Sequence, residues 1–124
     1  MIGYQVQPVR SQDVGFQEES ARQRAFRGIY FLSARRALEE GQRFFRSSDG
    51  EKTGLHVSEA QGLKPYVVHW SEHPEAEVQE DLFLLPPDAV ASSVIDLYVH
   101  CVNEDGCLLD ARPATPEELE ARSA

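Results

Sequence analysis

One stretch of this chain has the pattern of an amphipathic helix, and it directly follows a short apolar run. In "ARRALEEGQRFFR", residues 34–46, small and apolar side chains recur at helical spacing, and arginines and glutamates occupy the other face. Ser33 can cap its first turn. The preceding "GIYFL", residues 28–32, is β-branched and aromatic, which predicts a buried strand. A strand that leads into a helix with one apolar face implies a sheet for that helix to cover.

Short apolar runs separated by turn residues predict the remaining strands. They are "IGYQV" near the N-terminus, "KPYVVHW" and "EVQEDLFLLP" in the middle, and two segments of "VIDLYVHCVNEDGCLLDAR". Ser58 and Gln61 have capping-box spacing, so "VSEAQG" predicts one helical turn. Thr115, Pro116 and Glu118 combine a cap, a first-turn proline and a capping glutamate, which predicts a short C-terminal helix.

These elements predict an α+β fold. Most strand connections are hairpin-length, so we expect a mostly antiparallel sheet of about five to six strands, packed on one main helix near residues 34–46. Residues 1–112 form a single domain in this interpretation, and residues 113–124 form a short helical tail. With 124 residues, the chain is long enough to bury a core without disulfides.

Both cysteines, Cys101 and Cys107, fall in a hairpin predicted for "VIDLYVHCVNEDGCLLDAR". With Gly106 as the bulge of its turn, the alternation of side chains points both thiols into the core. They are then diagonal neighbours about 7–8 Å apart at Cα, farther apart than a disulfide spans. We therefore expect two buried free thiols, although a turn slipped to five residues would place them face to face. The same register sets His100 opposite Asp110 on the other face.

No apolar run approaches the length of a transmembrane helix. The N-terminal "MIGYQVQPVR" alternates polar and apolar residues and does not have the basic and apolar regions of a signal peptide. The chain also has only two cysteines. These features predict a cytoplasmic protein in a reducing compartment, without insertion into a membrane.

Candidate chemistry is sparse, and no diagnostic catalytic motif occurs. His100 and Asp110 form a candidate acid–base pair, but no nucleophile accompanies them. The histidines and cysteines are poorly spaced for a metal, so we expect neither a metal nor a cofactor. An alternative ligand pocket would lie either at His100 and Asp110 or at the Ser33 helix start with Tyr30, because a helix N-terminus can hold an anion.

The run that ends in "GIYF" and leads into a helix resembles the second strand of ADP-ribosyltransferase-like domains. That resemblance implies a nucleotide site, but the first strand, "IGYQV", has no Arg or His in the place of the family's NAD-anchoring residue. Only Glu80 or Asp81 could stand for the family's late glutamate. The resemblance is confined to this short stretch, so we do not assign the chain to the family.

Charge is distributed unevenly along the sequence. Residues 1–64 carry ten basic and eight acidic side chains, residues 65–124 carry two basic and thirteen acidic ones, and the whole chain has a net charge of −9. No Lys or Arg occurs between Pro65 and Ala111. This distribution opposes direct nucleic-acid binding, despite an arginine cluster within residues 22–46. It favours a partner with a basic protein surface.

The leading hypothesis is a small acidic, non-catalytic protein-binding domain of the inhibitor, immunity-type or regulatory kind. A small enzyme or ligand-binding domain is the alternative. The predicted contact residues are four acids of a hairpin and one aromatic anchor: Trp70, Glu75, Glu77, Glu80 and Asp81. Trp70 could equally be a core residue. A homodimer through an exposed edge strand near Tyr4 is a further expectation.

Overall fold

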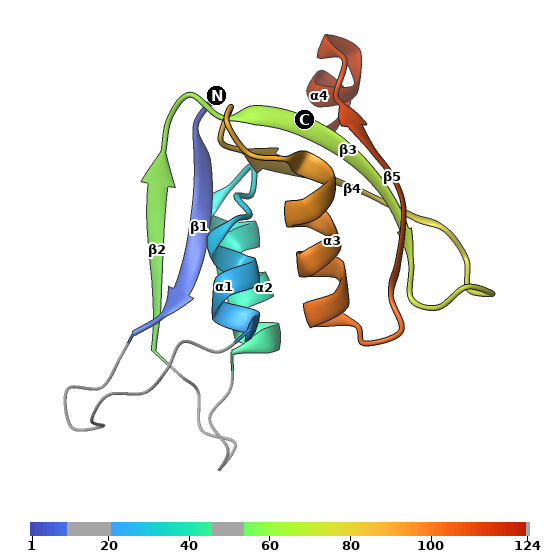
Figure 1. The fold of residues 1–124 in the computed structure, drawn as a ribbon. Coiled ribbons are helices and arrows are strands. Elements are labelled where there is room, and N and C mark those ends of the chain that lie inside the picture. The colour runs from blue at the N-terminus through green and yellow to red at the C-terminus, as the bar shows by residue number, and fades with distance from the viewer. Residues whose placement is uncertain (10–20, 46–53, 124) are drawn as a thin grey trace.

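The computed structural model describes residues 1–9, 21–45 and 54–123, and within them the chain has four helices and five strands. In chain order these are β1 (Gly3–Pro8), α1 (Ala21–Arg27), α2 (Ala34–Phe44), β2 (Leu55–Ala60), β3 (Lys64–Ser71), β4 (Gln79–Leu85), α3 (Ala91–Val102), β5 (Cys107–Pro113) and α4 (Pro116–Ser123) (Figure 1). The predicted α+β class is therefore confirmed.

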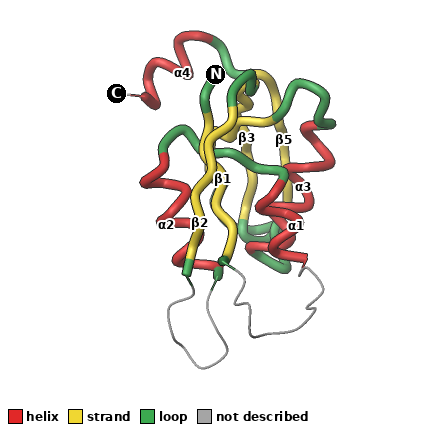
Figure 2. The backbone as a smooth tube through the Cα atoms, turned by 90° about the vertical axis from the view of Figure 1, so that its left-hand side faces the viewer, coloured by secondary structure: helices red, strands yellow, loops and turns green. Residues whose placement is uncertain are grey.

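The strands form two antiparallel sheets rather than one larger sheet on a single main helix. Strands β1 and β2 make a two-stranded sheet, and the order in the three-stranded sheet is β4–β3–β5. Helix α2 packs against both strands of the smaller sheet, and α1 packs against β1 (Figure 2). The predicted antiparallel pairing is confirmed, and so is the β3–β4 hairpin.

The buried strand predicted at residues 28–32 is reduced to two bridging residues. The backbone of Phe31 exchanges hydrogen bonds with Tyr4 of β1, at 2.9 and 2.7 Å, and the backbone of Tyr30 does the same with Leu84 of β4, at 3.0 and 2.9 Å. Each residue pairs on one side only, so the segment links the two sheets without becoming a strand of either. Tyr4 thus bridges to Phe31 in addition to facing β2, and the edge-strand dimer expected near it remains a prediction.

Residues 94–102 were predicted as a strand of a hairpin, and that prediction is wrong. They belong to α3, in which the helical spacing of Ile95, Tyr98 and Val99 buries all three, while Leu97 is left 47% exposed. The segment is rich in β-branched residues but its apolar positions also fit a helix, and the core under α3 decides between the two. Strand β5 pairs with β3 instead.

The change of hairpin partner also alters the predicted positions of the cysteines. Cys101 lies on α3 and Cys107 begins β5, and both are free, as predicted, but only half-buried. The predicted neighbours His100 and Asp110 no longer face each other across a hairpin. His100 Nε2 lies 3.2 Å from Asp96 Oδ1, one helical turn away on α3.

Two other local predictions have opposite outcomes. The helical turn expected at residues 57–62 is wrong, because most of that stretch belongs to β2, which pairs with β1 along its length. The C-terminal capping box is confirmed: the Glu118 backbone N–H donates to Thr115 Oγ1 at 3.2 Å, and the Thr115 N–H donates to Glu118 Oε1 at 3.0 Å. Helix α2 and its Ser33 cap are confirmed as well.

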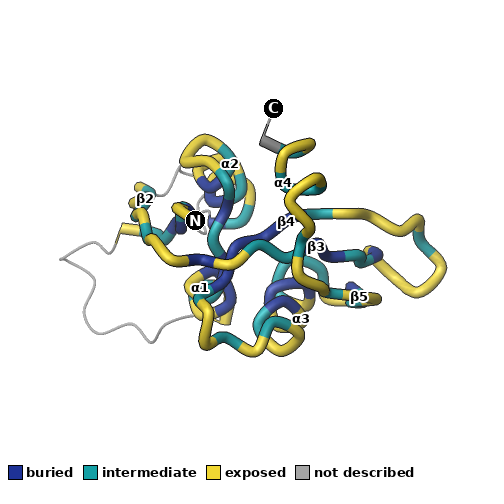
Figure 3. Tube along the Cα trace, turned by 90° about the horizontal axis from the view of Figure 1, so that it is seen from above, coloured by how far each residue is buried: buried dark blue, intermediate teal, exposed yellow. Residues whose placement is uncertain are grey.

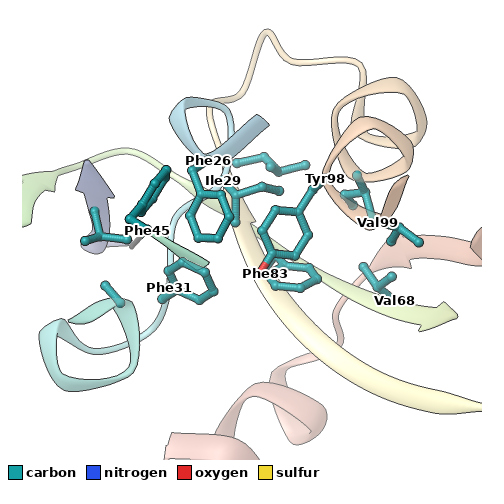
Figure 4. Close-up of a cluster of buried hydrophobic side chains, with 12 residues drawn as sticks. Phe26, Ile29, Phe31, Phe45, Val68, Phe83, Tyr98 and Val99 are labelled. Carbon is teal, nitrogen blue, oxygen red and sulfur yellow. The ribbon is translucent and has the colours of Figure 1, made fainter. Parts of the chain in front are cut away.

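The three-stranded sheet has two differently covered faces. Its inner face contributes Val68, Phe83 and Leu85 to the main core, where rings from α1, α3 and residue 31 pack edge to face (Figure 4). Its outer face contributes a smaller cluster, with α4 lying above it (Figure 3). The buried residues of that smaller cluster are Leu63, Val67, Leu82 and Leu84.

Candidate functional site

The turn between β3 and β4 is acidic and exposed. We call this turn, residues 72–78, the acidic arm; it extends beyond the rest of the described chain (Figures 1 and 3). A backbone bond from Ala76 N–H to the His73 carbonyl, at 2.9 Å, closes the turn. The three acids of the arm are Glu72, Glu75 and Glu77, all exposed, and none of them contacts a cation among the described residues.

The pairing of β5 with β3 adds acids to the same end of the sheet. Ser71, at the base of the arm, pairs with Cys107, so the short α3–β5 turn lies beside the arm. That turn contains Glu104 and Asp105, both exposed. Since no Lys or Arg occurs between Pro65 and Ala111, no nearby side chain of this stretch offsets these charges.

Glu80, a predicted contact residue, is already engaged on the outer face. His69 Nε2 lies 3.1 Å from Glu80 Oε2, and Arg122 of α4 also contacts the Glu80 carboxylate. On the other side of the same histidine, Asp110 Oδ2 lies 3.8 Å from His69 Nδ1. The cross-strand register β4–β3–β5 explains this grouping, because it sets Glu80 and Asp110 on either side of His69.

Asp81 and Trp70 are engaged on the inner face. Trp70 Nε1–H donates to Asp81 Oδ2 at 2.9 Å, and the Arg36 guanidinium of α2 donates to Asp81 Oδ1 at 2.6 Å. The same guanidinium lies over the rings of Phe31 and Phe83, 5.6 and 5.9 Å from their centroids. Both carboxylate oxygens of Asp81 are thus used: one joins α2 to the sheet through Arg36, and the other joins β4 to β3 through Trp70. Trp70 packs against the main core, in agreement with the alternative prediction that it is a core residue rather than an exposed anchor.

A polar contact between helices α2 and α3 was not predicted from the sequence. The hydroxyl of Tyr98, a residue only 5% exposed, donates to Glu40 Oε2 at 3.4 Å. Burial raises the pKa of Glu40, and the nearby Arg36 opposes that rise. Burial, with the nearby Glu40 carboxylate, raises the pKa of Tyr98 well above its ordinary value. A helical interpretation of residues 91–102 would have placed Tyr98 in the core and shown that its hydroxyl needs a partner.

The residues of the alternative pocket are not brought together by any shared contact. Ser33 Oγ accepts the backbone N–H of Arg36 at 3.2 Å as a helix cap, and Tyr30 links the sheets through its backbone. His100 is paired with Asp96, whereas Asp110 lies beside His69. Within residues 1–9, 21–45 and 54–123, no three His, Cys, Asp or Glu side chains are grouped so as to hold a metal ion.

Comparison with known proteins adds no relative. No family model, curated protein or solved structure matches this chain. In the part of the chain that the structure describes, every helix is too short or too polar to cross a membrane. The candidate site is therefore defined by geometry alone: an exposed acidic arm, whose base is tied to the body by Asp81 on one face and by Glu80 on the other.

Proposed function

We propose that this chain is a non-catalytic binding protein that presents the acidic arm to a basic surface of another protein. The observation that carries the proposal is the exposed position of Glu72, Glu75 and Glu77 on a projecting turn, within a stretch that has no Lys or Arg. A surface of one charge sign steers association with an oppositely charged partner and raises the association rate.

The base of the arm supports a binding role because it is held in one position. Asp81 bonds to Trp70 and Arg36 on the inner face, and Glu80 contacts His69 and Arg122 on the outer face. A surface that is already ordered loses less conformational entropy when a partner binds. Val78, 53% exposed, adds an apolar contact next to the acids. Glu75 and Glu77 remain the principal contact residues in this proposal, whereas Glu80, Asp81 and Trp70 position the arm.

The alternative of a small enzyme has weaker support. Its two candidate catalytic groups, His100 and Asp110, have different partners on different elements, and neither lies beside an identified nucleophile. General acid–base chemistry needs the two groups within hydrogen-bonding distance of one reacting atom.

The test is capture of partners from a lysate of the source cells at low and at moderate salt. The immobilised native chain is compared with Glu75→Lys/Glu77→Lys. The matched control is Glu59→Lys/Asp88→Lys, which makes the same change in net charge at two exposed positions outside the arm. We expect the native and control chains to retain the same basic protein, less of it at moderate salt, and the arm variant to retain at least tenfold less.

Two results would contradict the proposal. If the control chain loses the protein as fully as the arm variant does, then net charge alone explains capture. If the arm variant retains the protein at the native level, the arm does not form the contact. Far-UV circular dichroism of all three chains confirms that each variant is folded before capture is compared.

A further inference from the structure

Helix α4 lies on the outer face of the three-stranded sheet and is held by a small set of side chains (Figures 1 and 3). Leu119 packs against the buried cluster of the outer face. One turn later, Arg122 pairs with Glu80, at the base of the acidic arm. At the start of the helix, Glu118 accepts two hydrogen bonds from the Arg112 guanidinium, at 2.6 and 2.7 Å. The outer face thus contacts a leucine and a basic residue three positions after it.

The surface under α4 combines an apolar floor with an acidic edge. Val67, Leu82 and Leu84 form the floor and are fully buried. Glu80 and Asp110 lie on either side of His69 at the edge nearest the arm. An apolar centre with a charged rim is the usual composition of a protein-binding surface. Helices bind such surfaces through apolar anchors at helical spacing.

Few contacts hold α4 on the sheet, so another helix could replace it there. A helix of eight residues has little stability of its own. Its ion pairs, Arg112 with Glu118 and Arg122 with Glu80, are partly exposed to solvent, and such pairs contribute only modestly. Only Glu118, Leu119 and Arg122 are half-buried among residues 116–122 of this helix, and the other four are exposed. A longer helix with more basic residues would contact both Glu80 and Asp110, whereas α4 contacts only Glu80 of the two.

We propose that the outer face of this sheet is a helix-binding site that α4 fills in the unbound chain. A basic amphipathic helix of the partner takes the place of α4. It carries a leucine-like side chain and a basic residue three positions after it. The inference rests on the proposed function, in that the basic partner drawn to the arm supplies this helix. The position of Glu80 next to the arm makes the two surfaces continuous. Helix α4 therefore competes with the partner.

The test uses the full chain and a labelled synthetic peptide. The probe is a fluorescein-labelled copy of residues 113–124 that carries Glu117→Lys and Glu120→Lys, so it keeps the capping box, Leu119 and Arg122 but is basic. Fluorescence anisotropy measures its binding to the native chain, to Arg122→Ala and to Leu119→Ala. The control peptide has Leu119→Asp. We expect each chain variant to bind the probe at least tenfold more tightly than the native chain, and none to bind the control peptide.

Equal affinity for the native chain and both variants would overturn the inference, as would equal binding of the control peptide. Arg122→Ala changes a side chain at the surface, so it keeps the test valid if Leu119→Ala does not fold. The two proposals fail separately. If arm variants lose the lysate partner but Arg122→Ala leaves both peptide binding and capture unchanged, only the helix site is wrong. If the peptide binds as expected but the arm variants still capture the lysate partner at the native level, the proposed binding role of the acidic arm is wrong.

Discussion

The inner and outer faces of the three-stranded sheet contain equally buried residues but are closed in different ways. On the inner face, Val68 and Phe83 lie under aromatic rings that come from α1, α3 and residue 31. On the outer face, Val67 and Leu82 are just as buried, yet part of their cover is the single side chain of Leu119 from a short terminal helix. The burial of a sheet residue therefore does not show how firmly its cover is attached.

The polar contacts of the two faces also differ, in how far they are exposed to solvent. The inner face uses bonds between distant elements with both partners partly enclosed, such as Arg36 with Asp81. The outer face uses ion pairs that remain more exposed, such as His69 with Glu80. A charge-assisted bond contributes more as its partners are removed from water. We therefore expect changes on the inner face to affect global stability and changes on the outer face to have smaller effects, mainly on α4.

The largest effect is expected for Phe26→Ala. Phe26 is fully buried, and its ring centroid lies 4.8 Å from that of Phe45 and 5.1 Å from that of Tyr98. Loss of such a ring leaves a cavity among rings that cannot all move, so the free energy of unfolding should fall by about 3–5 kcal/mol. Urea denaturation followed by fluorescence measures it. A decrease below about 1 kcal/mol would show that the aromatic cluster repacks and is not the rigid face described above.

An intermediate effect is expected for Asp81→Asn, with Glu80→Gln as its counterpart on the outer face. The Asp81 side chain is 26% exposed and that of Glu80 is 47% exposed. Removing the Asp81 charge weakens its bond to Arg36 and should lower the free energy of unfolding by about 1–3 kcal/mol. The exposed Glu80 pair should contribute only about 0.2–1 kcal/mol. Thermal unfolding of both variants compares them, and equal losses would remove the distinction between the faces.

A smaller and local effect is expected for Leu119→Ala. The side chain is half-buried, so its loss should decrease stability by about 1 kcal/mol. Because α4 is a terminal element, its opening need not unfold the sheet. Amide hydrogen exchange should therefore become faster in α4 while β3 keeps its protection. Simultaneous loss of protection in β3 would show that α4 and the sheet open together and that α4 is not an exchangeable cover.

The smallest effect concerns pH. Hydrogen bonds from Arg112, with help from the Thr115 backbone, lower the pKa of Glu118 from 4.5 to about 2. Since the folded pKa is the lower one, the contribution of Glu118 to α4 is complete above pH 4.5 and disappears as the pH falls through about 2. The amide signals of α4 in NMR spectra should change in that interval, and Glu118→Gln should abolish the change. A transition near neutral pH would contradict this assignment.

Local sequence signals predicted those elements whose interactions lie within a few residues. The Ser33 cap bonds to residue 36, and the Thr115–Glu118 box spans one turn, so both are visible in the sequence. The β3–β4 hairpin is similar, since two β-rich runs flank one polar turn. The same reasoning left Glu75 between the two runs, and it is exposed on the turn, whereas Glu77, expected to begin the second strand, precedes β4 and is exposed as well.

The roles of the other predicted contact residues depend on distant partners. Asp81 bonds to Arg36, which precedes it by 45 positions, and Glu80 contacts Arg122, which follows it by 42. Nothing near these acids in the sequence indicates that they are occupied. Their acidity was correctly noted, but whether an acid faces a partner or solvent is decided by packing.

The amino-acid sequence by itself determined the α+β class, the amphipathic helix α2, the caps of α2 and α4, and the uneven distribution of charge. Only the tertiary structure decided that residues 94–102 belong to a helix, that residues 30 and 31 link two sheets, and that β5 pairs with β3. The reason is physical: caps and helical spacing act over one turn of chain. In contrast, β-branched apolar segments fit a strand or a helix almost equally well, and the core that they join selects one of them.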